Sequence, residues 1–286
     1  MKRSGKRGAA VAGELRAFLD KKVAEYNRPA FVADDPIRIP HGYSRRQDIE
    51  IAAFFTAIFS WGNRTTIIRK SEELMRLMDQ APYEFVLHHT DKDLKRLLDF
   101  RHRTFNATDL LYFVAFFRHH YSHYDSLEDA FLRPWEERGP AKKGWEAERA
   151  LSAFYHYFFS LDESNDWRPS AEGGSAPLVP PRTRKHIASP EKNSSCKRIN
   201  MFLRWMVRKD NNGVDFGLWR RIGQDRLICP LDLHVARVAK KFGLLTRPSS
   251  DWLAAMELTE HLREFDANDP AKYDFALFGL GALEKF

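Results

Sequence analysis

Two side chains in the C-terminal part of the chain could form a nucleophile and carboxylate pair: Lys197 and Asp232. A neutral lysine amine attacks a carbonyl carbon or a sugar C1′ to give an imine, and a nearby carboxylate stabilises the developing cation and helps to move protons. The chain between them is long enough for one helix, a turn and a connector. Whether the two side chains meet therefore depends on the elements that carry them.

Asp232 precedes "LHVARVAKKFG" (233–243), which the apolar spacing predicts to be an amphipathic helix ending at Gly243. From Leu233, the expected apolar face consists of Val235, Val238, Ala239 and Phe242. Aspartate is a favoured N-cap, because its carboxylate accepts hydrogen bonds from first-turn N–H groups and suits the positive end of the helix dipole. Capping alone therefore explains Asp232 as readily as catalysis does.

Lys197 lies in "NSSCKRINMFLRWMVRKDNNG" (193–213), for which we predict a helix capped by Ser194 or Ser195 and ended by the Asn-Asn-Gly turn. In the first turn the helix dipole disfavours an ammonium and so favours a nucleophilic amine. The expected buried stripe is Ile199, Phe202, Leu203, Met206 and Val207, and the opposite face holds Lys197, Asn200, Arg204 and Arg208. A solvated polar face is the alternative explanation of Lys197.

The composition predicts a folded protein without a membrane partner. The chain has 286 residues, 43% of them hydrophobic, which suffices for one large or two small domains. No apolar run approaches the roughly 20 residues of a membrane span, and the basic N-terminus leads into no apolar signal core, so we expect a cytoplasmic protein. Its two cysteines, Cys196 and Cys229, are too few for a four-cysteine zinc or iron–sulfur site, and no metal or cofactor is expected.

The net charge is +7, and one stretch of the sequence accounts for a surplus of that size. This basic segment, 182–208, holds a single acid, Glu191. Its basic residues are Arg182, Arg184, Lys185, Lys192, Lys197, Arg198, Arg204 and Arg208. Such an imbalance indicates a polyanionic partner, and a solvated charged surface is the alternative.

Helical periodicity extends along the chain, so we predict an all-α fold. Besides the two segments above, the expected helices are 13–27, 49–61, 65–79, 108–123, 147–161, a short one at 215–223, 250–266 with Ser250 or Asp251 as its cap, and 270–283 with Pro270 in its first turn. The stretch 162–184 is rich in Gly, Pro and Ser and predicts a long loop.

Four stretches resemble the helix-hairpin-helix DNA glycosylase superfamily, above all the archaeal 8-oxoguanine DNA glycosylases and an uncharacterised bacterial branch. "PLDLHVARVAKKFGL" (230–244) matches the superfamily pattern Pro-x-Asp-x-His-x-x-Arg-Val, and "CKRINMFLRWMVR" (196–208) resembles the helix that carries its lysine nucleophile. "FSWGNRTTI" (59–67) is similar to the loop that enters the DNA, and "DPAKYDFALFGLG" (269–281) also has counterparts. One departure is "EKNSSCK" (191–197), which stands where the usual hairpin has Leu-Pro-Gly-Val-Gly.

The resemblance implies a base-excision repair glycosylase with β-lyase activity. Its substrate would be double-stranded DNA with a damaged base or an abasic site, and the base a flipped oxidised purine such as 8-oxoguanine. Lys197 would be the Schiff-base nucleophile and Asp232 the catalytic carboxylate. The implied fold has two helical subdomains with a cleft between them, 48–213 and 1–47 plus 214–286. We expect a monomer, associated with the nucleoid.

Further site residues follow from the resemblance and the basic segment. We expect DNA contacts from Asn63, Arg64, Ser194, Ser195, Arg198, Arg204 and Arg208, and a base pocket from Trp61, Asn200, Lys272, Tyr273 and Asp274. Structural roles stay open: a turn for Asn63, core packing for Tyr273, Trp205 and Trp219, and a hydrogen bond behind the cap for His234. The alternative function is a non-catalytic, structure-specific nucleic-acid-binding helical module.

Overall fold

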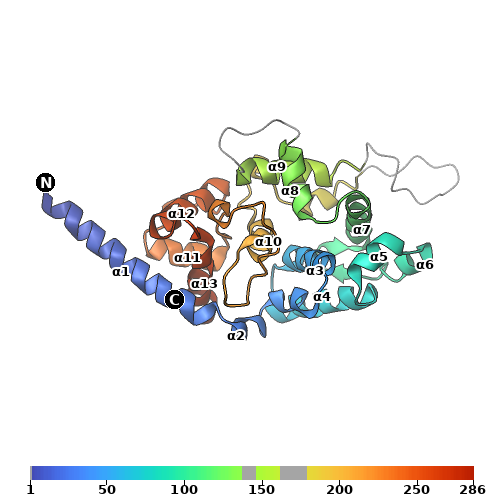
Figure 1. Ribbon diagram of the computed structural model, residues 1–286, viewed down its shortest axis with the longest axis horizontal. Coiled ribbons are helices and arrows are strands. Elements are labelled where there is room, and N and C mark those ends of the chain that lie inside the picture. Colours follow the sequence, from blue (N-terminus) through green and yellow to red (C-terminus); the bar gives the residue numbers. More distant parts are fainter. Residues whose placement is uncertain (1, 137–145, 162–178) are drawn as a thin grey trace. The chain divides into compact units, whose positions relative to one another are not determined.

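The structure is a computed structural model that describes residues 2–136, 146–161 and 179–286 (Figure 1). The described chain forms two compact units. Unit 1 comprises Met1–Asp34 and Asn193–Phe286, and unit 2 comprises Asp35–Lys192. Both are built from helices, and the strands in these ranges are the two short ones of a single hairpin. The prediction of an all-α fold is confirmed.

Unit 2 is a bundle of helices with one small hairpin. Its α-helices are α3 (Arg46–Phe59), α4 (Arg64–Leu77), α5 (Pro82–His88), α6 (Asp91–Lys95), α7 (Ala107–Tyr121), α8 (Glu128–Glu136) and α9 (Ala147–Phe158). Its shorter elements are η1 (Pro36–Arg38), η2 (Pro40–Gly42), β1 (Arg101–His102), β2 (Phe105–Asn106), η4 (Thr183–His186) and η5 (Pro190–Lys192). Residues 162–178 of the expected loop lie outside the described residues.

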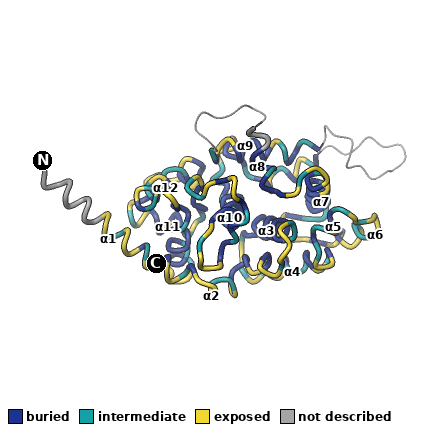
Figure 2. The backbone as a smooth tube through the Cα atoms, viewed as in Figure 1, coloured by how far each residue is buried: buried dark blue, intermediate teal, exposed yellow. Residues whose placement is uncertain are grey.

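The core of unit 2 is a set of phenylalanine rings around α3. Every residue of α3 from Ile49 to Phe59 is buried, which gives this helix its dark colour in Figure 2. Phe54 makes an edge contact with Phe117, with ring centroids 5.5 Å apart. Such ring pairs add roughly 0.5–1.5 kcal/mol each beyond the apolar area they bury. Aromatic packing therefore accounts for the high phenylalanine content of this part of the chain.

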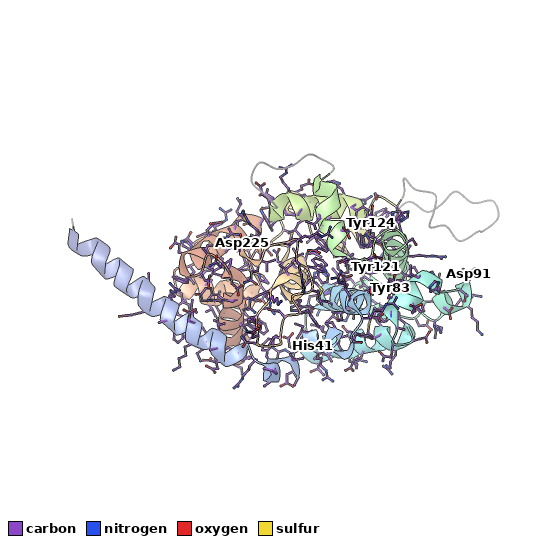
Figure 3. The ribbon with its side chains drawn as sticks, in the orientation of Figure 1. His41, Tyr83, Asp91, Tyr121, Tyr124 and Asp225 are labelled. Atoms are coloured by element: carbon purple, nitrogen blue, oxygen red, sulfur yellow. The ribbon has the colours of Figure 1, made fainter. Side chains whose placement is uncertain are left out.

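One charged residue lies within that core. Glu50 is fully buried, and its carboxylate accepts hydrogen bonds from the Tyr121 hydroxyl (2.8 Å), the Ser126 hydroxyl (2.7 Å) and the Leu127 N–H (3.0 Å). Tyr121 also contacts the Tyr83 ring edge to face at 5.2 Å, and the two tyrosines are labelled side by side in Figure 3. A buried carboxylate with three donors is a satisfied structural group, so it holds α3, α7 and the start of α8 together.

Unit 1 combines the N-terminal helix with the C-terminal third of the chain. Its elements are α1 (Lys2–Tyr26), α2 (Pro29–Val32), α10 (Lys197–Val207), η6 (Gln224–Arg226), α11 (Leu233–Lys241), α12 (Trp252–Phe265), η7 (Pro270–Lys272), α13 (Tyr273–Phe278) and η8 (Gly279–Leu283). The predicted helices at 233–243 and 250–266 are confirmed, the second with Asp251 as its cap. The expected helix at 270–283 is divided into η7, α13 and the wider turn η8.

The short helix expected at 215–223 is absent, and this prediction was wrong. The segment lies against the end of α10 instead, where the N–H of Phe216 donates to Trp205 O and the N–H of Trp219 donates to Met206 O. Gly217 has φ +57°, and a Cβ there would come within 2.7 Å of Lys209. Hydrogen bonding to a neighbouring element thus replaces the internal bonds of a helix.

The bounds of the units differ from the expected ones, because unit 2 is Asp35–Lys192 whereas the expected subdomain is 48–213. The α10 segment belongs with the C-terminal helices of unit 1, because its arginines pair with carboxylates from the segments 210–215 and 269–274. Lys197 and Asp232 therefore lie in the same unit. No helix in the described part of the chain is long and apolar enough to cross a membrane.

Candidate active site

The structure brings Lys197 and Asp232 together. Lys197 is the first residue of α10, Asp232 is the N-cap of α11, and Lys197 Nζ lies 3.9 Å from Asp232 Oδ2. The lysine side chain is 28% exposed and the aspartate side chain 17% exposed. An amine and a carboxylate are thus in contact at a position that solvent, and hence a ligand, can reach.

Asp232 uses its two carboxylate oxygens differently. Oδ1 accepts the N–H of Val235 at 2.8 Å, the standard N-cap bond, whereas Oδ2 faces Lys197 Nζ. The capping explanation of Asp232 is therefore confirmed, and it leaves one oxygen free of the cap. The first turns of α10 and α11 also meet at this pair, so the positive ends of two helix dipoles lie near it.

The segment before Lys197 fixes its position by local hydrogen bonds. Cys196 has φ +51° and is the N-cap of α10, so the prediction that Ser194 or Ser195 caps this helix was wrong. Ser194 Oγ instead accepts the N–H of Cys196, and Ser195 Oγ donates to Leu231 O over 3.4 Å. Because Leu231 precedes Asp232, this bond links the lysine and aspartate segments directly.

Asn200 and Gly281 support the same arrangement from inside. Asn200 is 1% exposed, and its side-chain N–H₂ donates to Ser195 O at 3.0 Å, which closes the turn before α10. A Cβ on Gly281 would come within 2.8 Å of His234 O, so only glycine lets the 279–283 turn approach the start of α11 so closely. Among the described residues the buried His234 Nδ1 has no hydrogen-bond partner, so the expected structural bond is not made by that atom.

Asp274 is a second carboxylate near the pair. It is 6% exposed and ion-paired with Arg204. Burial raises its pKa to about 6, and the nearby Asp232 acts in the same direction, whereas Arg204 and Lys197 oppose the increase. Of the expected base-pocket residues on 272–274, Asp274 is thus the one whose charge acts on Lys197 and Asp232.

The variant Asp274→Asn is expected to change how stability depends on pH. The folded-state pKa of Asp274, about 6, lies above the ordinary aspartate value of 3.8, so the folded protein binds this proton more tightly than the unfolded chain. Wild type therefore loses stability as the pH rises from about 4 to about 6, by up to ~3 kcal/mol at 1.36 kcal/mol per pKa unit. The asparagine amide of the variant cannot ionise, so urea unfolding across this range should show the variant gaining stability relative to wild type.

Carboxylates whose pKa is lowered, such as Asp210, are present in both proteins. Their contributions to the pH dependence of stability therefore cancel when the variant is compared with wild type. The control is Asp225→Asn, which makes the same chemical change at a half-exposed carboxylate of the same unit. A stability difference between wild type and Asp274→Asn that stays constant with pH contradicts the raised pKa.

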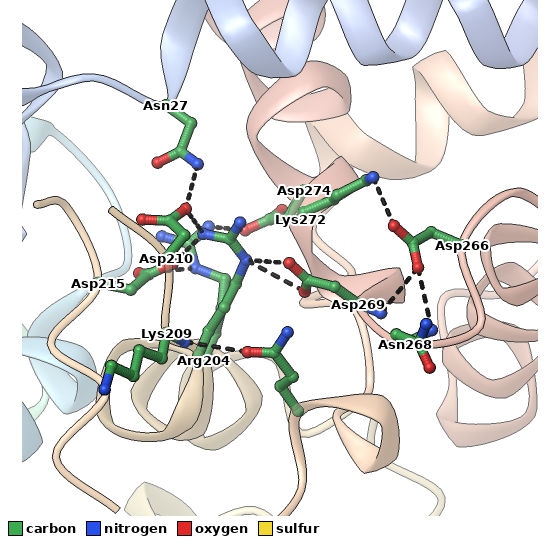
Figure 4. Close-up of polar contacts among 12 residues, drawn as sticks. Asn27, Arg204, Lys209, Asp210, Asp215, Asp266, Asn268, Asp269, Lys272 and Asp274 are labelled. Carbon is green, nitrogen blue, oxygen red and sulfur yellow. Dashed lines mark hydrogen bonds and ion pairs between the residues drawn. The ribbon is translucent and has the colours of Figure 1, made fainter. Parts of the chain in front are cut away.

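Arg204 and Arg208 are not surface residues, and the expectation that they contact DNA was wrong. They are 4% and 2% exposed. Arg204 pairs with Asp215 (3.3 Å) and Asp274, so its charge is neutralised inside unit 1. The carboxylates around Arg208 are Asp210 (2.8 Å), Asp215 (3.0 Å) and Asp269 (3.0 Å). Figure 4 shows Arg204 in this network with Asp215 and Asp274.

The basic segment is divided between the two units. Its first four basic residues belong to unit 2 and the other four to unit 1. Lys192 lies over the Tyr155 ring, with Nζ 4.3 Å from the centroid, and Arg184 lies over Phe159. Arg198 is half-buried. The surplus charge that the sequence shows is therefore dispersed or, at Arg204 and Arg208, internally compensated.

Lys272 is ion-paired within unit 1, and Tyr273 packs in its core. Lys272 Nζ lies 2.6 Å from Asp266 Oδ2, and the Tyr273 hydroxyl donates to Asp20 of α1 at 2.9 Å. Tyr273 is 0% exposed, so the expectation that it contacts a base was wrong and the alternative, core packing, is confirmed. Trp205 and Trp219 are likewise buried in the core of unit 1.

The loop residues expected to enter DNA lie in unit 2. Asn63 is the N-cap of α4, where its side chain accepts the N–H of Thr66 at 3.1 Å, so a structural role explains it. Arg64 begins α4 and is half-buried. Trp61 is half-exposed and carries the Arg103 guanidinium over its ring.

Sequence reasoning missed two features of this site. The buried acids that bind the arginines of α10 follow no spacing rule, since they come from distant parts of the sequence. Leu233, the first residue of α11, is 80% exposed next to Asp232, and the sequence pattern assigned it no role. An apolar side chain beside the pair is available for contact with an apolar ligand surface.

The model of a family described as "Protein of unknown function (DUF2400)" matches residues 35–283. The chain belongs to this family. The match includes both Lys197 and Asp232, so the DUF2400 region contains the whole candidate site. No curated protein and no solved structure matches the DUF2400 chain.

Proposed function

We propose that the protein is a DNA glycosylase with a lyase step, of the helix-hairpin-helix type, acting on an oxidised purine in double-stranded DNA. The observation that carries the proposal is the 3.9 Å contact between Lys197 Nζ and Asp232 Oδ2 at the N-terminal ends of two helices. The helical character of both units and the motif-level resemblance support the choice of this fold. The two helix ends favour an anionic substrate.

In the proposed reaction the Lys197 ammonium first gives up a proton to solvent, and the neutral amine then attacks C1′ of a nucleotide that has been flipped out of the duplex. The C1′–N bond breaks, its electrons leave with the base, and the base takes up a proton. Asp232 stabilises the cationic charge that develops on the sugar at C1′ and its ring oxygen. Loss of a proton from the new amine and opening of the sugar ring give the imine. Removal of a C2′ proton then expels the 3′ phosphate, which breaks the strand.

A panel of duplexes, each with a single damaged purine, tests the proposal with wild type and Asp232→Asn. We expect wild type to release at least one of the bases. Asn keeps the oxygen that caps α11 but lacks the charge, so folding should be nearly normal and base release at least ~100-fold slower.

The matched control is Asp251→Asn at the N-cap of α12, where Oδ1 accepts the N–H of Ala254 at 2.9 Å. This control makes the same chemical change at an N-cap of the same unit and should leave base release per folded molecule unchanged. Equal slowing in both variants would assign Asp232 to capping alone. Binding of wild type to the duplexes without base release from any of them would instead support the non-catalytic binding module.

A further inference from the structure

Unit 2 carries a tight hairpin whose turn presents arginine side chains to solvent. β1 pairs with β2 through His102 and Phe105, so Arg103 and Thr104 form the two-residue turn. Arg101 and Arg103 are both exposed. Arg103 has φ +55°, a region that favours glycine or asparagine over a long side chain. The turn geometry itself therefore does not explain an arginine at this position.

The Arg103 side chain is held in place by the loop before α4. Its guanidinium carbon lies 4.2 Å from the centroid of the Trp61 ring. The next residue, Gly62, has φ +103°, and a Cβ there would come within 2.3 Å of Arg103 Nη1. Stacking restrains the guanidinium but leaves its N–H edges available, which is the geometry that binds phosphate oxygens in pairs. Glycine at 62 is thus required for this arrangement.

A second basic stretch is fixed beside the hairpin. Arg182 is 42% exposed, and its Nη2 donates to Thr104 O at 2.8 Å. The buried Asp109 accepts the Thr183 hydroxyl at 2.8 Å and lies 3.1 Å from His186 Nε2, which holds η4 against the start of α7. Arg182 lies 3.3 Å from the same carboxylate. Asp109 is buried and already engaged, and within the described part of the chain neither Arg101 nor Arg103 is ion-paired with a carboxylate.

The two stretches, 100–106 and 182–186, contain no aspartate or glutamate. Their basic residues, all exposed or half-exposed, are Arg101, Arg103, Arg182, Arg184 and Lys185. We propose that this surface, the hairpin patch, binds the phosphodiester backbone of DNA through unit 2, as a contact additional to the Lys197 and Asp232 site. The choice of DNA among polyanions rests on the proposed function, and a half-exposed tryptophan beside arginines is the combination that nucleic-acid surfaces use.

The test is the salt dependence of binding to a short, undamaged duplex, followed by fluorescence anisotropy. Each lost phosphate contact lowers the slope of log K against log salt by about 0.9. We expect a slope shallower by about 1 for Arg103→Gln and by about 2 for Arg101→Gln combined with Arg103→Gln. Glutamine matches the length of the stem, and both sites are exposed, so thermal unfolding should be unchanged.

The matched control is Arg118→Gln, which removes the same charge from the same unit. Arg118 is exposed in the last turn of α7, about 16 Å along that helix from the residue that follows β2. Its slope should equal that of wild type. A third variant, Trp61→Leu, keeps every charge but removes the ring beneath Arg103, so affinity should fall about tenfold at each salt concentration.

The outcomes separate this proposal from the proposed function. Normal base release with equal slopes in wild type and the Arg103 variants overturns the hairpin patch alone. Altered slopes without base release from any lesion overturn the glycosylase and leave the patch in place. Failure of wild type to bind an undamaged duplex at low salt overturns the patch. The patch is also overturned as a DNA site if wild type binds polyglutamate and Arg103→Gln weakens that binding as much as it weakens DNA binding.

Discussion

Replacing Lys197 by Ala is expected to abolish the covalent complex that wild type forms with a damaged or abasic duplex in the presence of borohydride. Borohydride reduces an imine at C1′ and so makes the link between protein and DNA permanent. Only a nucleophilic amine produces this link, and Lys197 Nζ is the amine that lies 3.9 Å from Asp232. The measurement is the fraction of DNA shifted to the mass of the adduct on a denaturing gel.

Two variants separate nucleophilicity from charge. Lys192→Ala removes a positive charge five residues upstream, at an exposed side chain that lies over the Tyr155 ring, and should leave the adduct intact. Lys197→Arg keeps a cation beside Asp232 but cannot form an imine, so it should retain DNA binding and lose the adduct. An adduct that persists in Lys197→Ala would show that another amine is the nucleophile. Base release without any adduct in wild type would point to a glycosylase that uses Asp232 and water.

The variant Arg204→Met is expected to lower the free energy of unfolding of unit 1 by about 3–5 kcal/mol, because it leaves the buried Asp274 without its arginine and Asp215 with Arg208 alone. Arg204 is 4% exposed and pairs with Asp215, whose side chain is fully buried, and with Asp274. Methionine fills a similar volume, so lost packing contributes little. Urea unfolding followed by the fluorescence of the core residues Trp205 and Trp219 measures the change.

The control for Arg204 is Arg226→Met. Arg226 pairs with Asp225 at 3.0 Å, but both side chains are about half-exposed, so the loss should stay below about 1 kcal/mol. A similar small loss in Arg204→Met would mean that the buried carboxylates are protonated or hydrated at little cost. In that case the ion pairs between the arginines of the α10 segment and the buried carboxylates would contribute little to the position of Lys197.

Much of the helical fold and the positions of two caps could be predicted from the sequence. The periodicity of 233–243 and 250–266 identified α11 and α12, because an apolar stripe opposite a polar face at helical spacing is the pattern of an amphipathic helix packed on a core. Asp232 was recognisable as a cap from residue type and position, and Asp251 was one of two candidates with Ser250. The side-by-side placement of Lys197 and Asp232 was a hypothesis from their residue types and spacing, and the structure brings these side chains together while their catalytic roles stay predictions.

Other features lay beyond sequence patterns for physical reasons. Periodicity placed Arg204 and Arg208 on a solvated face, but α10 is covered on that face by acids that come from distant positions in the sequence. The start of α10 was misplaced because Cys196 adopts a left-handed conformation that its residue type does not signal. The non-helical 215–223 segment depends on backbone bonds to Trp205 and Met206, which only the tertiary structure supplies.

Because both thiols are buried, their reactivity reports local opening of unit 1. Cys196 adjoins Lys197, Cys229 lies close to Asp232 and Asp274, and each is 0% exposed. Burial raises the pKa of the Cys196 thiol to about 12 and that of the Cys229 thiol well above its usual range, so neither forms a thiolate while the unit is closed. Alkylating reagents and oxidants therefore reach these sulfurs only during local opening. The rate at which Cys196 and Cys229 are modified therefore reports how often the segments that carry Lys197 and Asp232 open.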